Sequence, residues 1–162
     1  MNSSSVRPAD EMETVVRSYG DTLYRLCFVM LGNESDAEDA VQDAFIKYMQ
    51  KAPQFKSADH EKAWLITVAK NRCRDILRFR KRHPQIDSDD LQEMPVSMPD
   101  GAILEALMSL PEKYRLVLML YYVEEYPIDD IARMIGKTAS AVKMRLQKGR
   151  KLLEEVYRKE YL

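Results

Sequence analysis

The sequence predicts an all-α protein of two small helical domains joined by an acidic, flexible linker. Two observations lead to this prediction. Apolar residues recur at helical spacing through most of the 162 residues, while the chain has only five glycines and few strand-like alternations. Residues 83–100 interrupt this periodicity with prolines and carboxylates, a pattern typical of a boundary between domains. We therefore expect domains at residues 9–82 and 101–158.

Charge is arranged along the chain in blocks that the formal net charge of −1 conceals. Residues 70–82 hold seven basic residues and one acidic residue. Residues 83–112 hold seven acidic residues and no lysine or arginine. Such blocks allow one chain to contact nucleic acid at some places and protein at others.

Several classes of protein are disfavoured by what the sequence contains. Its longest apolar run, residues 116–123, is too short to span a bilayer. Cys27 and Cys73 occupy apolar positions of predicted helices, as buried thiols do in a reducing cytoplasm. His60 and His83 have no partners at zinc spacing. We expect a cytoplasmic protein that is not an enzyme, with no cofactor, metal site or small-molecule substrate.

The first predicted helix spans residues 9–31 and ends at Gly32–Asn33, because Val15, Leu23 and Leu26 recur at helical spacing. A second helix follows to about Lys51. Its start is predicted at a capping box, Ser35–Glu38.

Asp39, Gln42 and Asp43 fall on the exposed side of this second helix. Their carboxylates have two interpretations. They compensate the positive end of the helix dipole, or they form an acidic docking face for a basic protein partner.

The third predicted helix runs from about His60 to Arg82, after a break at Pro53. Its inner face is apolar. Trp64 near its start belongs to the core or forms a base-stacking platform, and we expect the core position. Polar and basic residues recur at spacings of three and four on another face: Thr67, Lys70, Asn71, Arg74 and Arg78. This stripe indicates contact with phosphates and bases, or else a solvated basic face.

The second domain begins with a helix at Asp100 or Gly101 that turns Leu107 and Leu110 inward. A second capping box is predicted at Ser109–Glu112. Residues 114–123 are apolar nearly all round, so we expect this helix at the centre of the second core.

Residues 127–151 predict two short helices with a tight turn between them. Gly136 ends the first helix, and Thr138 or Ser140 caps the second. Residues 131–153 carry seven basic residues and no acidic one. This is typical of a helix-turn-helix, whose second helix enters the DNA major groove, although a surface hairpin with a solvated basic face has the same pattern.

Three of these segments together resemble one family. SDAEDAVQDAFIKYMQ at 35–50, AWLITVAKNRCRDILR at 63–78 and SLPEKYRLVLMLYYVEEYPIDDIARMIGKTASAVKMRLQKGRKLL at 109–153 are similar to motifs of bacterial RNA polymerase sigma factors of the extracytoplasmic-function group. The resemblance covers about Tyr19 to Val156. It implies a protein that binds core RNA polymerase, directs it to specific promoters and helps to open the DNA.

The resemblance also implies roles for individual residues. Polymerase contact falls on Asp39, Gln42 and Asp43. Contact with the minus-ten element falls on Lys56, Ser57, Lys70, Asn71, Arg74 and Arg78, with Lys56 and Ser57 bordering a pocket for a flipped base. Contact with the minus-thirty-five element falls on Ser140, Lys143, Met144, Arg145, Gln147 and Lys148.

Two of these positions leave questions open. Arg145 reads bases or braces the fold. Met144 stands where the family usually has a small polar residue, and a methionine offers apolar contact, for example to a thymine methyl group, but no hydrogen-bond donor.

The resemblance further implies an anti-sigma partner, often membrane-bound, and a linker that threads near the polymerase active site. Two other functions stay open at this stage. A stand-alone helix-turn-helix regulator explains residues 127–151 but not a second basic stripe. A helical adaptor explains the acidic faces but not the two basic helices.

Overall fold

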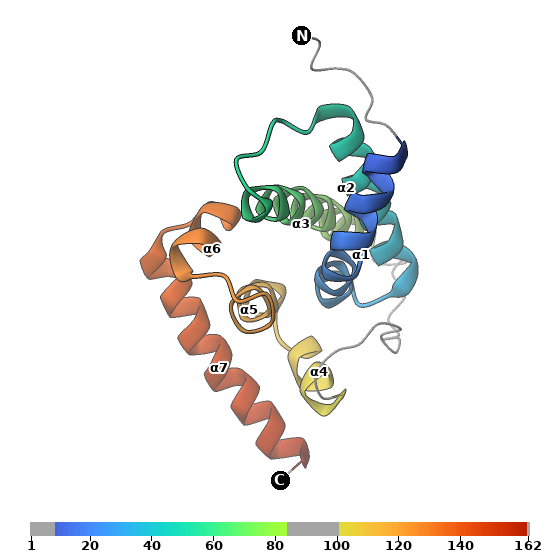
Figure 1. The fold of residues 1–162 in the computed structure, drawn as a ribbon. Coiled ribbons are helices and arrows are strands. Elements are labelled where there is room, and N and C mark those ends of the chain that lie inside the picture. The colour runs from blue at the N-terminus through green and yellow to red at the C-terminus, as the bar shows by residue number, and fades with distance from the viewer. Residues whose placement is uncertain (1–8, 84–100, 162) are drawn as a thin grey trace. The chain divides into compact units, whose positions relative to one another are not determined.

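The computed structural model describes residues 9–83 and 101–161, which fold into helices and turns without a strand (Figure 1). The chain separates into two compact units, with the division between Glu93 and Met94. The predicted all-α fold with two helical domains is confirmed. The domain limits at 9–82 and 101–158 stay predictions, and the linker 83–100 lies outside the described residues except for His83.

The first unit consists of three helices, each packed against the other two: α1 (Ala9–Leu31), α2 (Glu34–Lys51) and α3 (Ala58–Arg82). Its core is apolar, because helical spacing brings one face of each helix inward. The following side chains are fully or almost fully buried: Leu23, Leu26, Phe28, Met30, Ala37, Ala40, Ala44, Tyr48, Leu65, Ile66 and Ala69. Cys27 and Cys73 are buried free thiols, as predicted.

Helix α2 begins earlier than the sequence predicts. Its N-cap is Asn33, whose side-chain oxygen accepts a hydrogen bond of 2.8 Å from the backbone N–H of Asp36. The predicted capping box at Ser35–Glu38 is therefore wrong. Both Asn and Ser cap helices well, but the backbone of Asn33 is the one in the extended conformation that a cap requires.

A single glutamate of α3 ties all three helices of the first unit together. Glu61 accepts a hydrogen bond of 2.9 Å from the Tyr19 hydroxyl of α1 and one of 2.5 Å from the Tyr48 hydroxyl of α2. Burial, together with the hydrogen bond to Glu61 and its charge, raises the pKa of Tyr19 to about 12. Tyr19 is therefore a neutral donor at physiological pH, and this polar contact fixes α3 against its neighbours.

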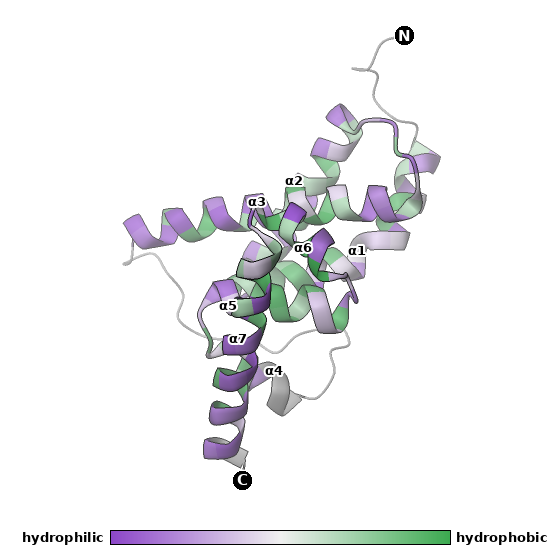
Figure 2. Ribbon diagram, turned by 90° about the vertical axis from the view of Figure 1, so that its left-hand side faces the viewer, coloured by the Kyte–Doolittle hydropathy of each residue, from purple (hydrophilic) through white to green (hydrophobic). Residues whose placement is uncertain are grey.

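The second unit contains α4 (Gly101–Met108), α5 (Glu112–Leu118), a π-helical turn (Met119–Val123), α6 (Ile128–Ile135) and α7 (Ala139–Tyr161). Helix α7 packs against α4, α5 and α6. The unit's buried residues include Leu107, Leu110, Leu116, Val117, Met119, Leu120, Ile131, Ile135, Val142 and Leu146. Figure 2 shows hydrophilic residues along the length of α7, which leaves only a narrow apolar stripe for this packing.

Two details of the second unit differ from the sequence-based expectations. Ser109 is not a helix cap: its hydroxyl donates to the Ala106 carbonyl at 2.6 Å, and α5 follows Pro111 without any side-chain cap. The segment at residues 114–123 lies in the core but is not buried on every side, since Tyr122 is 52% exposed. The Tyr122 hydroxyl instead accepts a hydrogen bond of 2.8 Å from Arg150 of α7.

The turn between α6 and α7 has the geometry predicted for a helix-turn-helix. Gly136 ends α6 in the left-handed conformation, with φ of 70°, and the N–H of Lys137 donates to the Ala132 carbonyl at 3.0 Å. Thr138, rather than Ser140, caps α7, because its hydroxyl accepts from the N–H of Ala141 at 3.1 Å. The turn thus sets where α7 begins and which of its residues face solvent.

Candidate nucleic-acid and protein interfaces

Helix α2 exposes a face that carries carboxylates. Asp39 and Gln42 are exposed, and Asp43 is half-exposed, while Ala37, Ala40 and Ala44 are buried on the opposite side. Asp39 is already in the second turn of α2, and the dipole effect fades within the first turn. Dipole compensation therefore does not account for Asp39 or Asp43, and their role in docking stays a prediction.

Asp43 also has a partner inside the first unit. Arg72 of α3 places its Nε 2.6 Å from Asp43 Oδ2, and the two side chains are 44% and 45% exposed, respectively. An ion pair with this exposure stabilises the fold by about 0–1 kcal/mol. The sequence did not show this pair, because it joins residues of different helices.

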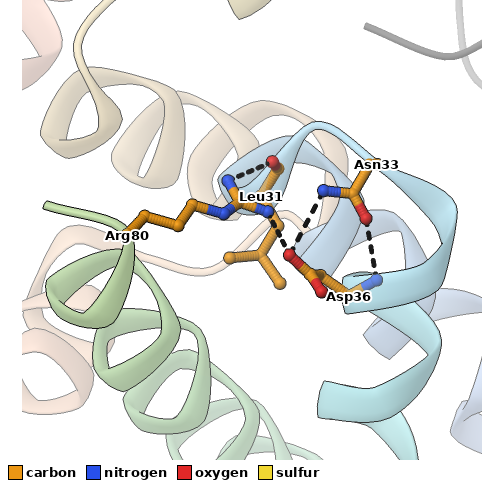
Figure 3. A network of polar contacts seen from close by, with 4 residues as sticks. All are labelled: Leu31, Asn33, Asp36 and Arg80. Atoms are coloured by element: carbon orange, nitrogen blue, oxygen red, sulfur yellow. Dashed lines mark hydrogen bonds and ion pairs between the residues drawn. The ribbon is translucent and has the colours of Figure 1, made fainter. Parts of the chain in front are cut away.

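The position of α2 is fixed by a polar network at its N-terminus (Figure 3). Arg80 of α3 donates to the Leu31 carbonyl at 2.7 Å and to Asp36 Oδ2 at 2.5 Å. The side-chain amide of Asn33 donates to the same oxygen of Asp36 at 3.2 Å. Burial by itself raises the pKa of Asp36, but the hydrogen bonds from Arg80 and Asn33 and the charge of Arg80 outweigh it and lower the pKa below its ordinary value.

The Asp36 network predicts acid sensitivity of the first unit. Because the folded-state pKa of Asp36 is depressed, its contribution is present above the unfolded value of about 3.9 and is lost as pH falls through the folded pKa. We expect Asp36→Asn to lower the free energy of unfolding by about 1–2 kcal/mol at pH 7, since the carboxylate is 36% exposed.

Trp64 is the single tryptophan of the chain and lies in the first unit, so its fluorescence during urea unfolding reports on this unit alone. The difference between wild type and Asp36→Asn should shrink as pH falls below about 4. A difference that stays constant from pH 7 to pH 3 would contradict this role of Asp36.

Helix α3 exposes fewer basic residues than the sequence predicts. Asn71 and Arg78 are exposed and Arg74 is half-buried, with Arg78 donating to Asp75 at 2.9 Å.

Lys70 is only 4% exposed, so the prediction that it lies on the open basic face is wrong. It falls three residues before Cys73 and four after Ile66, and helical spacing places it in that buried stripe. A side chain buried to this extent is not accessible to a DNA strand, so we leave Lys70 out of the proposed interface.

The loop before α3 places Lys56 and Ser57 side by side on the surface. The Ser57 hydroxyl caps α3 by accepting from the N–H of His60 at 3.1 Å, and helix α3 begins two residues earlier than predicted. The Lys56 N–H donates to His60 Nδ1 at 3.2 Å. These bonds hold the loop against α3 and leave the Lys56 side chain exposed.

The same loop is packed against the helices through an aromatic cluster that includes its own Phe55. Phe55 stacks on Tyr48 of α2 and meets Trp64 of α3 edge-on, with ring centroids 5.9 and 5.8 Å apart. Trp64 also meets Tyr48 edge-on. Trp64 is half-buried in this cluster, so it packs against its neighbours at the edge of the core rather than within it.

Helix α7 presents the predicted upstream-element residues on one surface. Ser140, Lys143, Met144, Gln147 and Lys148 are exposed, and Arg145 is half-buried. A groove of about 850 Å³ runs along this surface and is lined by Lys113, Tyr114, Ala141, Met144, Arg145, Gln147, Lys148, Arg150 and Lys151. Five of the lining residues are cationic and none is acidic, so the groove is positively charged. Arg145 lines the groove and is partly covered, so both of its possible roles stay open.

Lys113 is a cation of this groove that sequence reasoning missed. It belongs to α5, far from α7 in sequence, and reaches the groove because α5 packs on α7. Gly149 permits this approach: a Cβ atom there would lie 3.2 Å from Cδ1 of Leu118. No local sequence signal marks Lys113.

Within the described ranges 9–83 and 101–161, no group of three or more His, Cys, Asp or Glu side chains is arranged to hold a metal ion. No helix in those ranges is both long enough and apolar enough to cross a membrane.

Comparisons with known proteins identify both units. Residues 15–83 match the family model for Sigma-70 region 2, and residues 100–153 match the model for Sigma-70 region 4. The chain is 28% identical over 168 residues to the ECF RNA polymerase sigma factor SigW of Bacillus subtilis, covering 92% of this chain and 90% of that one.

A second relative and one solved structure agree with this result. The chain is 31% identical over 144 residues to the ECF RNA polymerase sigma factor SigM of Mycobacterium tuberculosis, covering 85% of this chain and 72% of that one. A chain in the structure of the sigma factor RpoE in complex with the anti-sigma factor NepR from Bartonella quintana has the same fold. Its TM-score is 0.78 at 23% identity, over 94% of this chain and 99% of that one. The chain therefore belongs to the extracytoplasmic-function group of bacterial RNA polymerase sigma factors.

Proposed function

We propose that three surfaces divide the work of transcription initiation in this sigma factor. The exposed face of α2, with Asp39, Gln42 and Asp43, binds core RNA polymerase. The surface of α3 and its preceding loop holds the unpaired minus-ten strand, and the groove side of α7 binds the minus-thirty-five element. The observation that carries the proposal is that α2 and α7 expose opposite charges. Helix α2 exposes carboxylates, whereas the α7 groove is lined by five cations and no carboxylate.

The α7 surface combines two kinds of DNA contact. Lysine and arginine side chains along the groove, including Lys113 of α5, bind phosphates and fix the register of α7 on the duplex. Side chains of its first three turns, Ser140, Lys143, Met144 and Gln147, face the base edges. Phosphate contacts supply affinity, and base contacts supply sequence preference.

The first unit acts on DNA that has opened. Taking a base out of the stack costs a few kcal/mol, and contacts with the released strand offset that cost. Asn71, Arg74 and Arg78 of α3 provide these contacts, and Lys56 and Ser57 border the site for a flipped base. The hydrogen bonds that the His60 N–H donates to Ser57 and that the Lys56 N–H donates to His60 keep this loop in place before DNA arrives.

The remaining parts of the proposal concern partners and location. By analogy with RpoE, whose structure contains the anti-sigma factor NepR, we propose that an anti-sigma partner holds this chain inactive. The chain works in the cytoplasm, where core polymerase is, and the polymerase performs the bond chemistry of RNA synthesis. Threading of the linker near the polymerase active site stays a prediction, since residues 84–100 lie outside the described structure.

A gel-shift and transcription experiment tests the proposal against a stand-alone regulator. The full chain is incubated with a promoter library carrying random upstream and downstream elements, with and without purified core polymerase. We expect sequence-selective binding and transcription only with core polymerase, because each unit alone makes few base contacts and the two act together at high effective concentration.

Two results would overturn the proposal. Selective binding of the isolated chain to DNA, unchanged by core polymerase, would support the regulator. Failure of the chain to bind core polymerase would contradict the assignment of α2 as the polymerase-binding face.

A further inference from the structure

Met144 is the most exposed of the large hydrophobic side chains in the described part of the chain. It is 68% exposed in the second turn of α7. Tyr122, the next most exposed at 52%, has a hydrogen bond from Arg150 that explains its position on the surface. Packing within the unit does not explain Met144.

The position of Met144 on α7 points it away from the unit's core. Val142 and Leu146 are buried, and each is two residues from Met144, which is about 200° around the helix axis. Ser140, Gln147 and Lys148, three or four residues away, share the exposed face with Met144. Met144 therefore lies in the middle of the face that the proposed function places in the major groove.

The surroundings of Met144 favour DNA over an apolar protein partner. Met144 edges the groove whose lining includes Lys113, Arg145 and Lys148 and no carboxylate. A row of cations next to Met144 suits contact with DNA phosphates. An apolar protein partner would bury these cations against uncharged groups, which is costly.

The chemistry of methionine then narrows what Met144 can recognise. The methionine side chain is unbranched and apolar, and its thioether sulfur cannot donate a hydrogen bond. Among the features that base edges present in the major groove, the C5-methyl group of thymine is the one that apolar contact reads. We propose that Met144 is a specificity-determining residue that selects a thymine in the minus-thirty-five element by contact with its methyl group; this rests on the proposed function of α7.

The test replaces thymine by deoxyuridine, which removes only this methyl group. A minus-thirty-five element selected by the holoenzyme from the promoter library is synthesised with each thymine of either strand replaced in turn. Binding of the duplex to holoenzyme, made from core polymerase and the full chain, is measured by fluorescence anisotropy at fixed salt. For wild type we expect one position at which the change weakens binding about threefold to fivefold, the loss expected from exposing one methyl group.

Three variants make the result specific. Met144→Ser should bind thymine and deoxyuridine DNA equally, whereas Met144→Leu, which keeps an apolar side chain, should retain most of the preference. Lys113→Ala is the matched control for a phosphate contact. It should weaken binding to both DNAs equally and reduce the slope of log K against log salt by about 0.9. Circular dichroism checks that each variant is folded.

The outcomes separate this inference from the proposed function. If the wild-type holoenzyme selects an upstream element but shows no loss at any deoxyuridine position, the inference is overturned and the function of α7 stands. If Met144→Ser keeps the thymine preference, or if the selected element contains no thymine, the inference is overturned as well. If the holoenzyme selects no upstream element at all, the assignment of α7 fails first.

Discussion

Replacing both Asp39 and Asp43 by lysine should weaken binding to core polymerase about 100-fold. The proposed partner surface is basic, so the substitution converts two attractions into two like-charge contacts, which cost several kcal/mol in an interface. Because every later step depends on the holoenzyme, promoter-specific transcription should fall by the same factor at limiting sigma concentration. The measurement is the affinity of labelled variant for core polymerase, followed by a transcription assay.

The ion pair between Asp43 and Arg72 needs a separate control, since Asp43→Lys also removes it. Arg72→Ala removes the pair and leaves both carboxylates exposed, so it should keep most of the polymerase affinity. The matched charge control is Glu13→Lys with Asp21→Lys on α1, which changes net charge by the same amount at two exposed positions. Equal affinity of the Asp39/Asp43 variant and this control would show that α2 is not the docking face.

Local signals were sufficient to predict the end of α6, the turn after it and the start of α7. Gly136 ends α6 where its freedom to adopt positive φ is needed, and Thr138 caps α7 with its own hydroxyl. Both interactions lie within a few residues, so the sequence contains all that determines them. The limit of this reasoning shows at α2, where Asn33, Ser35 and Glu38 all have capping chemistry and the backbone conformation decides among them.

Side chains whose environment depends on other helices could not be placed from sequence. Lys70 has the residue type of a surface stripe, but helix packing buries its position, because α1 and α2 both cover α3. Lys113 joins the α7 groove only through the packing of α5 on α7. The pairing of Asp43 with Arg72 joins residues on two helices, and periodicity within one helix carries no information about it.

The second large effect concerns promoter opening. Asn71→Ala combined with Arg74→Ala should reduce the population of open complexes about 100-fold, while binding to the duplex upstream element stays near wild type. Two lost contacts, one of them charged, are worth together about 3 kcal/mol, which is about a factor of 100. Permanganate footprinting measures unpaired thymines in the minus-ten region, and a gel shift on duplex containing only the upstream element measures the other step.

A pre-melted template distinguishes loss of strand contacts from a folding defect. A promoter with a mismatched bubble at the minus-ten element needs no free energy for melting. If Asn71 and Arg74 act by stabilising the unpaired strand, the double variant should therefore recover most of its transcription on this template. A variant that had lost the structure of the first unit would stay inactive on both templates, since α2 would be lost with it. Arg74 is half-buried, so Trp64 fluorescence during unfolding must accompany the assay. Normal permanganate reactivity of the double variant on duplex DNA would refute the assignment of α3, because the cost of opening would then be offset elsewhere.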